Sequence, residues 1–149
     1  MPSFLDSKLA VIAVEVGVSS AFQEVCDRNM DAYSLPRQAL ALIDTGASVS
    51  IVDLSVINHL LIAEKERTSV CGFIGDPQEF PTYDVSLKVL NRSGEVILNE
   101  SDFRVVGANL KSNGYDAIIG MDLLHSFTLR FLHQKGLADI RATTPDFVI

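Results

Sequence analysis

The chain has 149 residues, of which 48% are hydrophobic and 21% charged, so it can bury a core and is unlike a disordered segment. Its 19 acidic and 12 basic residues give a net charge of -7. That balance argues against a general nucleic-acid binder, which needs basic surface to displace the counterions around phosphates, and weakly favours substrates with some positive charge. The length predicts one domain over residues 1–149.

The N-terminus carries no visible secretory signal, because residues 1–6 lack a basic segment and no long apolar segment follows. The longest apolar runs, such as Leu9–Val14, are too short to cross a bilayer. We therefore expect a cytoplasmic protein with no membrane partner. Cys26 and Cys71 could form one disulfide, but without an export signal we expect two reduced, buried thiols.

Short strands dominate the predicted elements. Residues 83–89 alternate apolar and polar side chains, as half-buried strands do, whereas the apolar spacing over residues 54–66 is helical. In chain order the sequence predicts a strand over 8–18, a helix over 20–29 opened by a serine cap, strands over 38–43 and 49–52, a helix over 54–66, strands over 68–73, 80–90, 95–98 and 103–106, an apolar strand and helical turn over 115–125, and a strand over 127–132. Many short strands with little helix indicate an all-β barrel or sandwich.

The sharpest local feature is the segment Leu42–Ser48, where an apolar strand delivers the carboxylate of Asp44 to its end. Gly46 permits close backbone approach, and the Thr45 hydroxyl can hold a loop by hydrogen bonding. Taken alone, Asp-Thr-Gly is more often a simple turn between two strands than a site.

A second motif changes that balance. Residues 118–124 read Ile-Ile-Gly-Met-Asp-Leu-Leu, an apolar strand followed by a glycine and a short helix. The segments 41–48 and 118–124 resemble the active-site loop and the second signature of retropepsin-like aspartic proteases. Residues 83–89 are similar to the strand that follows the flap in that family. The resemblance implies an all-β, closed-barrel-like fold with one or two short helices.

The resemblance also implies a chemistry and a partner. Aspartic proteases use two carboxylates that share a proton to activate a water, without metal or cofactor. The sequence holds one Asp-Thr-Gly and no second Asp-Thr-Gly or Asp-Ser-Gly, so Asp44 would have to meet the Asp44 of a second copy in a homodimer. The implied function is an endopeptidase that cleaves peptide or protein substrates between apolar residues.

Further roles follow from the resemblance position by position. Thr45, Gly46 and Ala47 would form the active-site loop, with Thr45 bonding across the dimer axis, and Gly120 would let the chain pass close beneath this loop. The residues expected to contact the substrate are Leu42, Val49, Ile51 and Ile118 in the body and Phe73, Ile74 and Gly75 in the flap. The flap would be the hairpin over residues 68–80, which a plain hairpin with a loop would also explain. Its Asp76-Pro77 departs from a mobile tip, because proline stiffens the chain.

Other departures keep alternatives open. Ser48 and Met121 stand where retroviral members often carry an Asp and an Arg that form an ion pair. Losing both charges leaves neither unpaired but removes an anchor for the substrate backbone. One alternative is therefore a catalytically inactive retropepsin-fold module for dimerisation or peptide binding, and another is an unrelated β-sandwich with a chance Asp-Thr-Gly.

The remaining expectations concern the surface. We expect the extra length over residues 19–38 to form a surface loop or helix, and the strands near residues 8–18 and 147–149 to supply a dimer sheet. The three histidines show no metal-binding spacing, so no metal site is expected.

Overall fold

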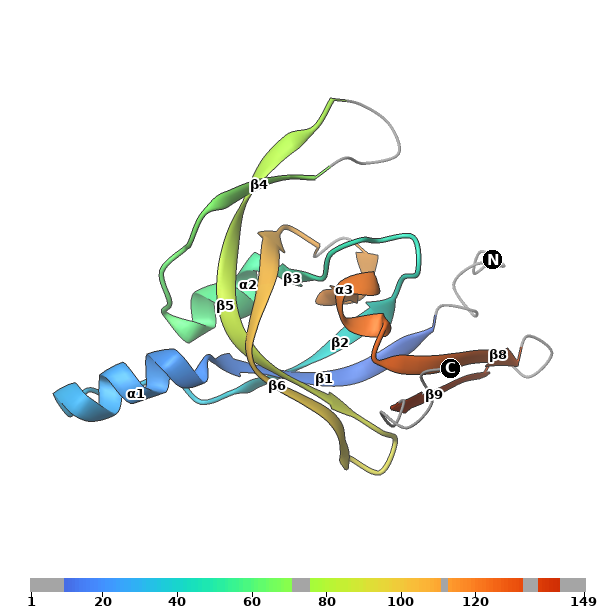
Figure 1. The fold of residues 1–149 in the computed structure, drawn as a ribbon, viewed down its shortest axis with the longest axis horizontal. Helices are drawn as coiled ribbons and strands as arrows, with labels where there is room; N and C mark the ends of the chain where they lie inside the picture. Colours follow the sequence, from blue (N-terminus) through green and yellow to red (C-terminus); the bar gives the residue numbers. More distant parts are fainter. Residues whose placement is uncertain (1–9, 71–75, 111–112, 133–136, 143–149) are drawn as a thin grey trace, which may run out of the picture.

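A computed structural model describes residues 10–70, 76–110, 113–132 and 137–142 of the chain, with side chains as far as residue 128 (Figure 1). This part of the chain is mostly β, as the sequence predicts. Its strands are β1 (Val11–Val18), β2 (Arg37–Ile43), β3 (Ile51–Asp53), β4 (Arg67–Val70), β5 (Gln78–Leu90), β6 (Val96–Ala108), β7 (Ala117–Ile119), β8 (Phe127–Leu132) and β9 (Leu137–Ala142). Its helices are α1 (Ser20–Asn29), α2 (Leu54–Leu60) and α3 (Met121–Leu124).

Six of the described strands close into a barrel in the order β1-β2-β7-β3-β6-β5, and β5 returns to β1. The pairs β2–β7 and β3–β6 are parallel, and the other pairs in the ring are antiparallel. The ring closes because β1 pairs with β2 through Val11–Val16 and with β5 through Ala13–Val18.

This closure contradicts part of one expectation about the dimer. The backbone of residues 13–16 is paired on both sides within the barrel, so this part of the predicted strand has no edge to offer a second copy. The other segment expected in a dimer sheet, residues 147–149, lies outside the described residues. The hairpin of β8 and β9 forms a separate two-stranded sheet.

The core fills the barrel, and α2 and α3 add side chains to it. Alternation along β1 turns Val14, Val16 and Val18 inward, where each is at most 1% exposed. Each such aliphatic side chain stabilises the fold by about 1.5–3 kcal/mol relative to exposure. The other largest fully buried side chains are Val52, Val56, Ile57, Leu60, Val85, Leu87, Val89, Val105 and Leu123.

Helix α2 is shorter than predicted. It begins at the cap Asp53, whose side chain accepts from the Ser55 amide, and ends at Leu61, which adopts the left-handed conformation with φ 54°. The apolar face that drives the helix stops at Leu60, since Leu61 is 82% exposed. The prediction of a helix through residue 66 is therefore wrong, and the chain turns instead toward β4.

Two strands also differ from expectation. The predicted strands over 95–98 and 103–106 are parts of one continuous strand, β6. The polar residues between them stay in the strand because β6 pairs with β5 along its length, with register shifts along the ladder. Strand β9 was not predicted, since its short sequence has no strong alternation. Helix α1 matches the prediction, with the Ser19 side chain accepting from the Phe22 amide.

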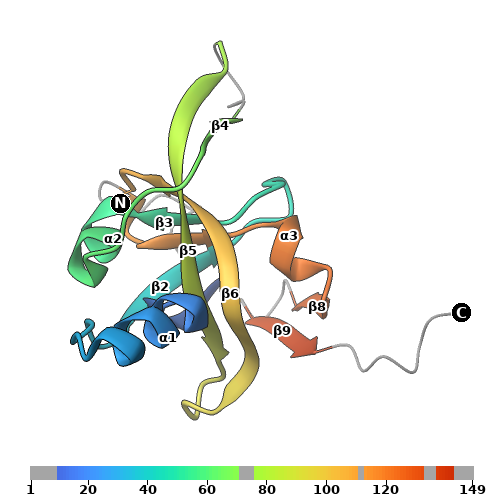
Figure 2. The same cartoon turned by 60° about the vertical axis from the view of Figure 1, so that its left-hand side comes forward.

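Helix α1 extends away from the barrel (Figure 2), so the added length before β2 is a surface helix as expected. Cys26 on this helix is a free, buried thiol, whereas Cys71 lies outside the described residues. Within the described ranges, no helix has the length and apolarity needed to cross a membrane.

Two adjacent leucines test this account of the core. Leu60→Ala should lower the free energy of unfolding by about 2–5 kcal/mol, because Leu60 is 1% exposed and its loss leaves a cavity. Leu61→Ala removes the same atoms from a side chain that is 82% exposed and should change stability by less than about 0.5 kcal/mol. Urea unfolding followed by circular dichroism measures both, and equal effects would contradict the burial described here.

Candidate functional site

The predicted carboxylate lies at the end of β2, where the chain leaves the barrel. The Asp44 amide donates to the Ile119 carbonyl of the neighbouring strand β7 at 3.0 Å, which fixes the backbone at this point. The Gly46 amide donates to Asp44 Oδ1 at 2.8 Å, and the Ala47 amide donates to the Asp44 carbonyl at 3.2 Å. Oδ2 accepts no hydrogen bond from any described residue. The side chain is half-buried, whereas Thr45 and Gly46 are exposed.

The loop after Asp44 rests directly on Gly120, as the sequence predicts. A Cβ on Gly120 would lie 2.6 Å from the Val49 carbonyl oxygen and 2.9 Å from that of Ala47, so no larger residue fits without a shift of backbone. The next residue adds a hydrogen bond, because the Met121 amide donates to the Ala47 carbonyl at 2.7 Å. The two motifs of the sequence therefore form one packed unit.

A buried hydroxyl and a carboxylate join the same two motifs. Ser50, which is 1% exposed, donates from its amide to Asp122 Oδ2 at 2.9 Å and from its hydroxyl to Asp122 Oδ1 at 2.7 Å. The Gly120 amide in turn donates to the Ser50 hydroxyl at 3.0 Å. Sequence analysis gave neither side chain a role. The available signal was an acidic residue two positions after the glycine of the second motif, with a serine just beyond the loop.

The two positions that lack the retroviral ion pair lie at the surface. Ser48 is exposed, and Met121 is 43% exposed. Neither position therefore holds a buried polar group in want of a partner. The contacts of Ser50 with Asp122 secure the loop here without a charged pair.

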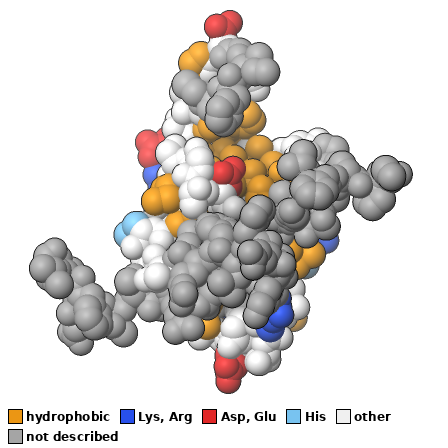
Figure 3. Space-filling model, turned by 90° about the vertical axis from the view of Figure 1, so that its right-hand side faces the viewer, with side chains coloured by type: hydrophobic (Ala, Val, Ile, Leu, Met, Phe, Trp, Pro, Cys, Tyr) orange, Lys and Arg blue, Asp and Glu red, His pale blue; other side chains and the backbone are white. Residues whose placement is uncertain are grey.

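A cavity of about 250 Å³ lies beneath the β4–β5 hairpin, which projects over the body of the barrel (Figure 1). Hydrophobic side chains gather between this hairpin and the body (Figure 3). The residues that line the cavity are Ile51, Val70, Asp76, Gln78, Phe80, Val106 and Ala108. Of these only Ile51 was predicted as a substrate contact. The predicted flap contacts Phe73, Ile74 and Gly75 lie outside the described residues.

Two other predicted contacts, Leu42 and Ile118, do not line the cavity but lie in a row of side chains that leads to it. Pairing places Leu42 opposite Ile118, Ile118 opposite Ile51, and Ile51 opposite Val106, across β2, β7, β3 and β6. Directly paired residues share one face of a sheet, so these four side chains form a row, which we call the apolar row. The row begins two residues before Asp44 and ends at the cavity. Val49, half-buried in the loop, is outside it.

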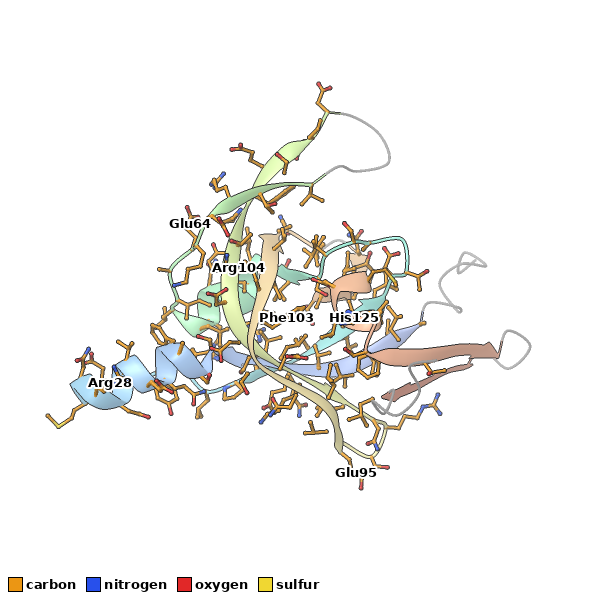
Figure 4. All side chains as sticks on the ribbon, in the orientation of Figure 1. Arg28, Glu64, Glu95, Phe103, Arg104 and His125 are labelled. Atoms are coloured by element: carbon orange, nitrogen blue, oxygen red, sulfur yellow. The ribbon has the colours of Figure 1, made fainter. Side chains whose placement is uncertain are left out.

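A charged cluster holds the base of the hairpin. Arg104 on β6 donates to both carboxylate oxygens of Asp84 on β5, at 2.8 and 3.2 Å, and also pairs with Glu66, which precedes β4. Figure 4 shows Arg104 where β5 and β6 run together below the hairpin. The hydrogen bonds from Arg104 lower the pKa of Asp84 below its usual value. The Thr82 amide donates to the Glu66 carbonyl at 3.1 Å, which adds a backbone link at the same point.

No family model matches the sequence, and no curated protein matches it. Among solved structures, the chain is similar to the EIAV protease complexed with the inhibitor HBY-793, with 22% identity over 59% of this chain and 75% of that chain and a TM-score of 0.34. It is also similar to the retroviral protease-like domain of Ddi1 from Leishmania major, with 16% identity over 95% of this chain and 100% of that chain and a TM-score of 0.45. At such low identity, the chemistry of the site has to follow from its own residues. Within the described ranges, no group of three or more His, Cys, Asp or Glu side chains could hold a metal ion.

The buried serine can be tested against its exposed neighbour. Ser50→Ala should lower the free energy of unfolding by about 1–3 kcal/mol, because it leaves the Gly120 amide and Asp122 Oδ1 without their partner. Ser48→Ala removes the same hydroxyl from an exposed position and should have an effect below about 0.5 kcal/mol. Urea unfolding measures both. Amide hydrogen exchange at Gly120 should accelerate only in the Ser50 variant, and unchanged exchange would contradict this role.

The charged cluster predicts a pH dependence of stability. Because the pKa of Asp84 is lowered in the folded state, its ionised form stabilises the fold above the unfolded value near 3.8, and that stabilisation is lost as the pH falls through the folded pKa. Asp84→Asn should therefore be less stable than the native chain at neutral pH, by at most about 1 kcal/mol for a pair this exposed. The difference should vanish in acid. Thermal unfolding from about pH 7 to 2 measures it, and a constant difference would be the contrary result.

Proposed function

We propose that the protein is an aspartic endopeptidase of the retropepsin type, in which Asp44 of each of two subunits forms the catalytic pair. The observation that carries this proposal is the placement of Asp44. Its carboxylate is half-buried at a strand end. One oxygen accepts a hydrogen bond from the Gly46 amide, and the other accepts none from any described residue. The apolar row starts beside it and leads to a cavity under the hairpin.

The chemistry requires two carboxylates in different protonation states. Two like charges at close range cannot both ionise readily, so the pair shares one proton. The ionised Asp44 takes a proton from a water, which attacks the peptide carbonyl, while the protonated Asp44 of the other subunit donates to the carbonyl oxygen. A shared proton favours a mildly acidic pH optimum.

One chain supplies half of this pair, so the proposal includes a homodimer. The exposed Thr45 and Gly46 leave the loop accessible to a second copy across a two-fold axis. Thr45 would then bond to the facing loop and keep the two carboxylates coplanar. The substrate is a peptide or protein segment that lies between the loop and the hairpin, with apolar side chains against the apolar row.

Cleavage of a diverse peptide pool, read by mass spectrometry at several pH values, tests the enzyme. We expect cuts between apolar residues, fastest in mild acid, and a loss of at least about 100-fold in Asp44→Asn, because an amide cannot exchange the proton. Asp31→Asn changes an exposed carboxylate in the loop after α1 and should cut like the native chain. If a folded dimer makes no cuts at any pH, the alternative of an inactive peptide-binding module takes precedence.

Mixing subunits tests the shared site. When native and Asp44→Asn chains are mixed equally and exchanged, about one quarter of the dimers carry two native carboxylates. Activity per total chain should therefore fall to about a quarter of the native value. A fall to about a half would mean that each chain acts alone, and the dimeric pair would be wrong.

A further inference from the structure

We propose that Asp76 makes the cavity under the hairpin select a basic side chain, lysine or arginine, from the substrate. This inference rests on the proposed function, since it assigns a substrate preference to the same cleft. It adds one charged position to a peptide whose cleaved bond is flanked by apolar residues.

The position of Asp76 follows from the pairing of the hairpin. Val70 lies opposite Gln78, and Thr68 lies opposite Phe80, so each pair shares one face. Val70, Gln78 and Phe80 line the cavity, which makes this the inner face. Asp76 precedes Gln78 by two residues and also lines the cavity, while remaining exposed at its rim.

The lining is suited to a side chain that is apolar along its length and charged at its end. Five of the seven described lining residues are apolar, and the remaining two, Asp76 and Gln78, are exposed and belong to the hairpin. Lysine and arginine pack their methylene stems against apolar surface and keep the charged end in water. A basic side chain can therefore place its stem against Ile51 and Phe80 and its charge beside Asp76.

The charge of the cavity favours a cation over the alternatives. Asp76 is the only charged residue among the described lining residues, and none of these is Lys or Arg. An acidic side chain would meet a like charge, and a purely apolar one would leave the carboxylate without a counterpart. The net charge of -7 also draws basic peptides toward the protein.

The test measures binding separately from cleavage. Fluorescent peptides that carry lysine or norleucine at each position in turn are titrated against the Asp44→Asn chain and against Asp44→Asn/Asp76→Asn. Norleucine keeps the stem of lysine and lacks its charge. At one position we expect lysine to bind about two- to fivefold more tightly than norleucine, as for a solvent-accessible ion pair. The preference should disappear with Asp76→Asn and weaken between about 0.05 and 0.5 M salt.

Glu79→Gln in the same background is the matched control. Glu79 lies opposite Ser69 on the outer face of the hairpin and does not line the cavity. The Glu79→Gln substitution therefore removes the same charge three residues from Asp76 but outside the cavity. Its lysine preference should match that of the parent. A preference that falls equally in both variants reflects net charge alone and overturns the proposal, as does a lysine preference that survives Asp76→Asn.

The outcomes separate this proposal from the proposed function. If the native chain cuts peptides but no position prefers lysine, the enzyme stands and the role of Asp76 is wrong. If lysine is preferred through Asp76 but the native chain cuts nothing, the basic pocket stands and belongs to a peptide-binding module. If no peptide binds at all, the role of Asp76 is overturned.

Discussion

The position of Asp44 depends on the close contact between its loop and Gly120. A residue with a Cβ at position 120 would push against the Val49 and Ala47 carbonyls, so the loop can lie where it does only because that side chain is absent. The Ser50 hydroxyl then bridges the Gly120 amide and the Asp122 carboxylate, so the buried hydroxyl has a partner both as donor and as acceptor. The apolar row begins at Leu42, two residues before the carboxylate that this contact positions.

The sequence could predict this loop because its signals are local. Asp44 follows an apolar strand, and Gly120 follows another, and each motif specifies its own turn. Helix α1 was predictable for the same reason, since its cap Ser19 is adjacent to it. The end of α2 was not predictable. The helical spacing of apolar residues continues in the sequence past Leu61, but the buried surface that stabilises the helix ends at Leu60.

The features that sequence reasoning missed are those set by long-range register. Nothing near Val106 indicates that it lies opposite Ile51, because β3 and β6 are neighbours in the barrel but lie far apart in the sequence. The cavity was missed for this reason, because the pairing of Val70 with Gln78 that defines the inner face of the hairpin also appears only in the structure. The dimer edge expected in this strand was wrong for residues 13–16 for a similar reason, since only the pairing with β5 reveals that both of their sides are used.

The pairing of β1 with both β2 and β5 has a consequence for how the chain folds. Strand β1 is synthesised well before its partners Val85–Leu90, which lie much later in the sequence. Strand β1 therefore keeps one edge unpaired until that part of the chain has been made, while β2 can cover the other edge. Contacts this distant in sequence raise the entropic cost of the folding transition state and slow folding toward the millisecond-to-second range typical of β-barrels. A chain interrupted before residue 85 would lack the partners that cover this edge of β1.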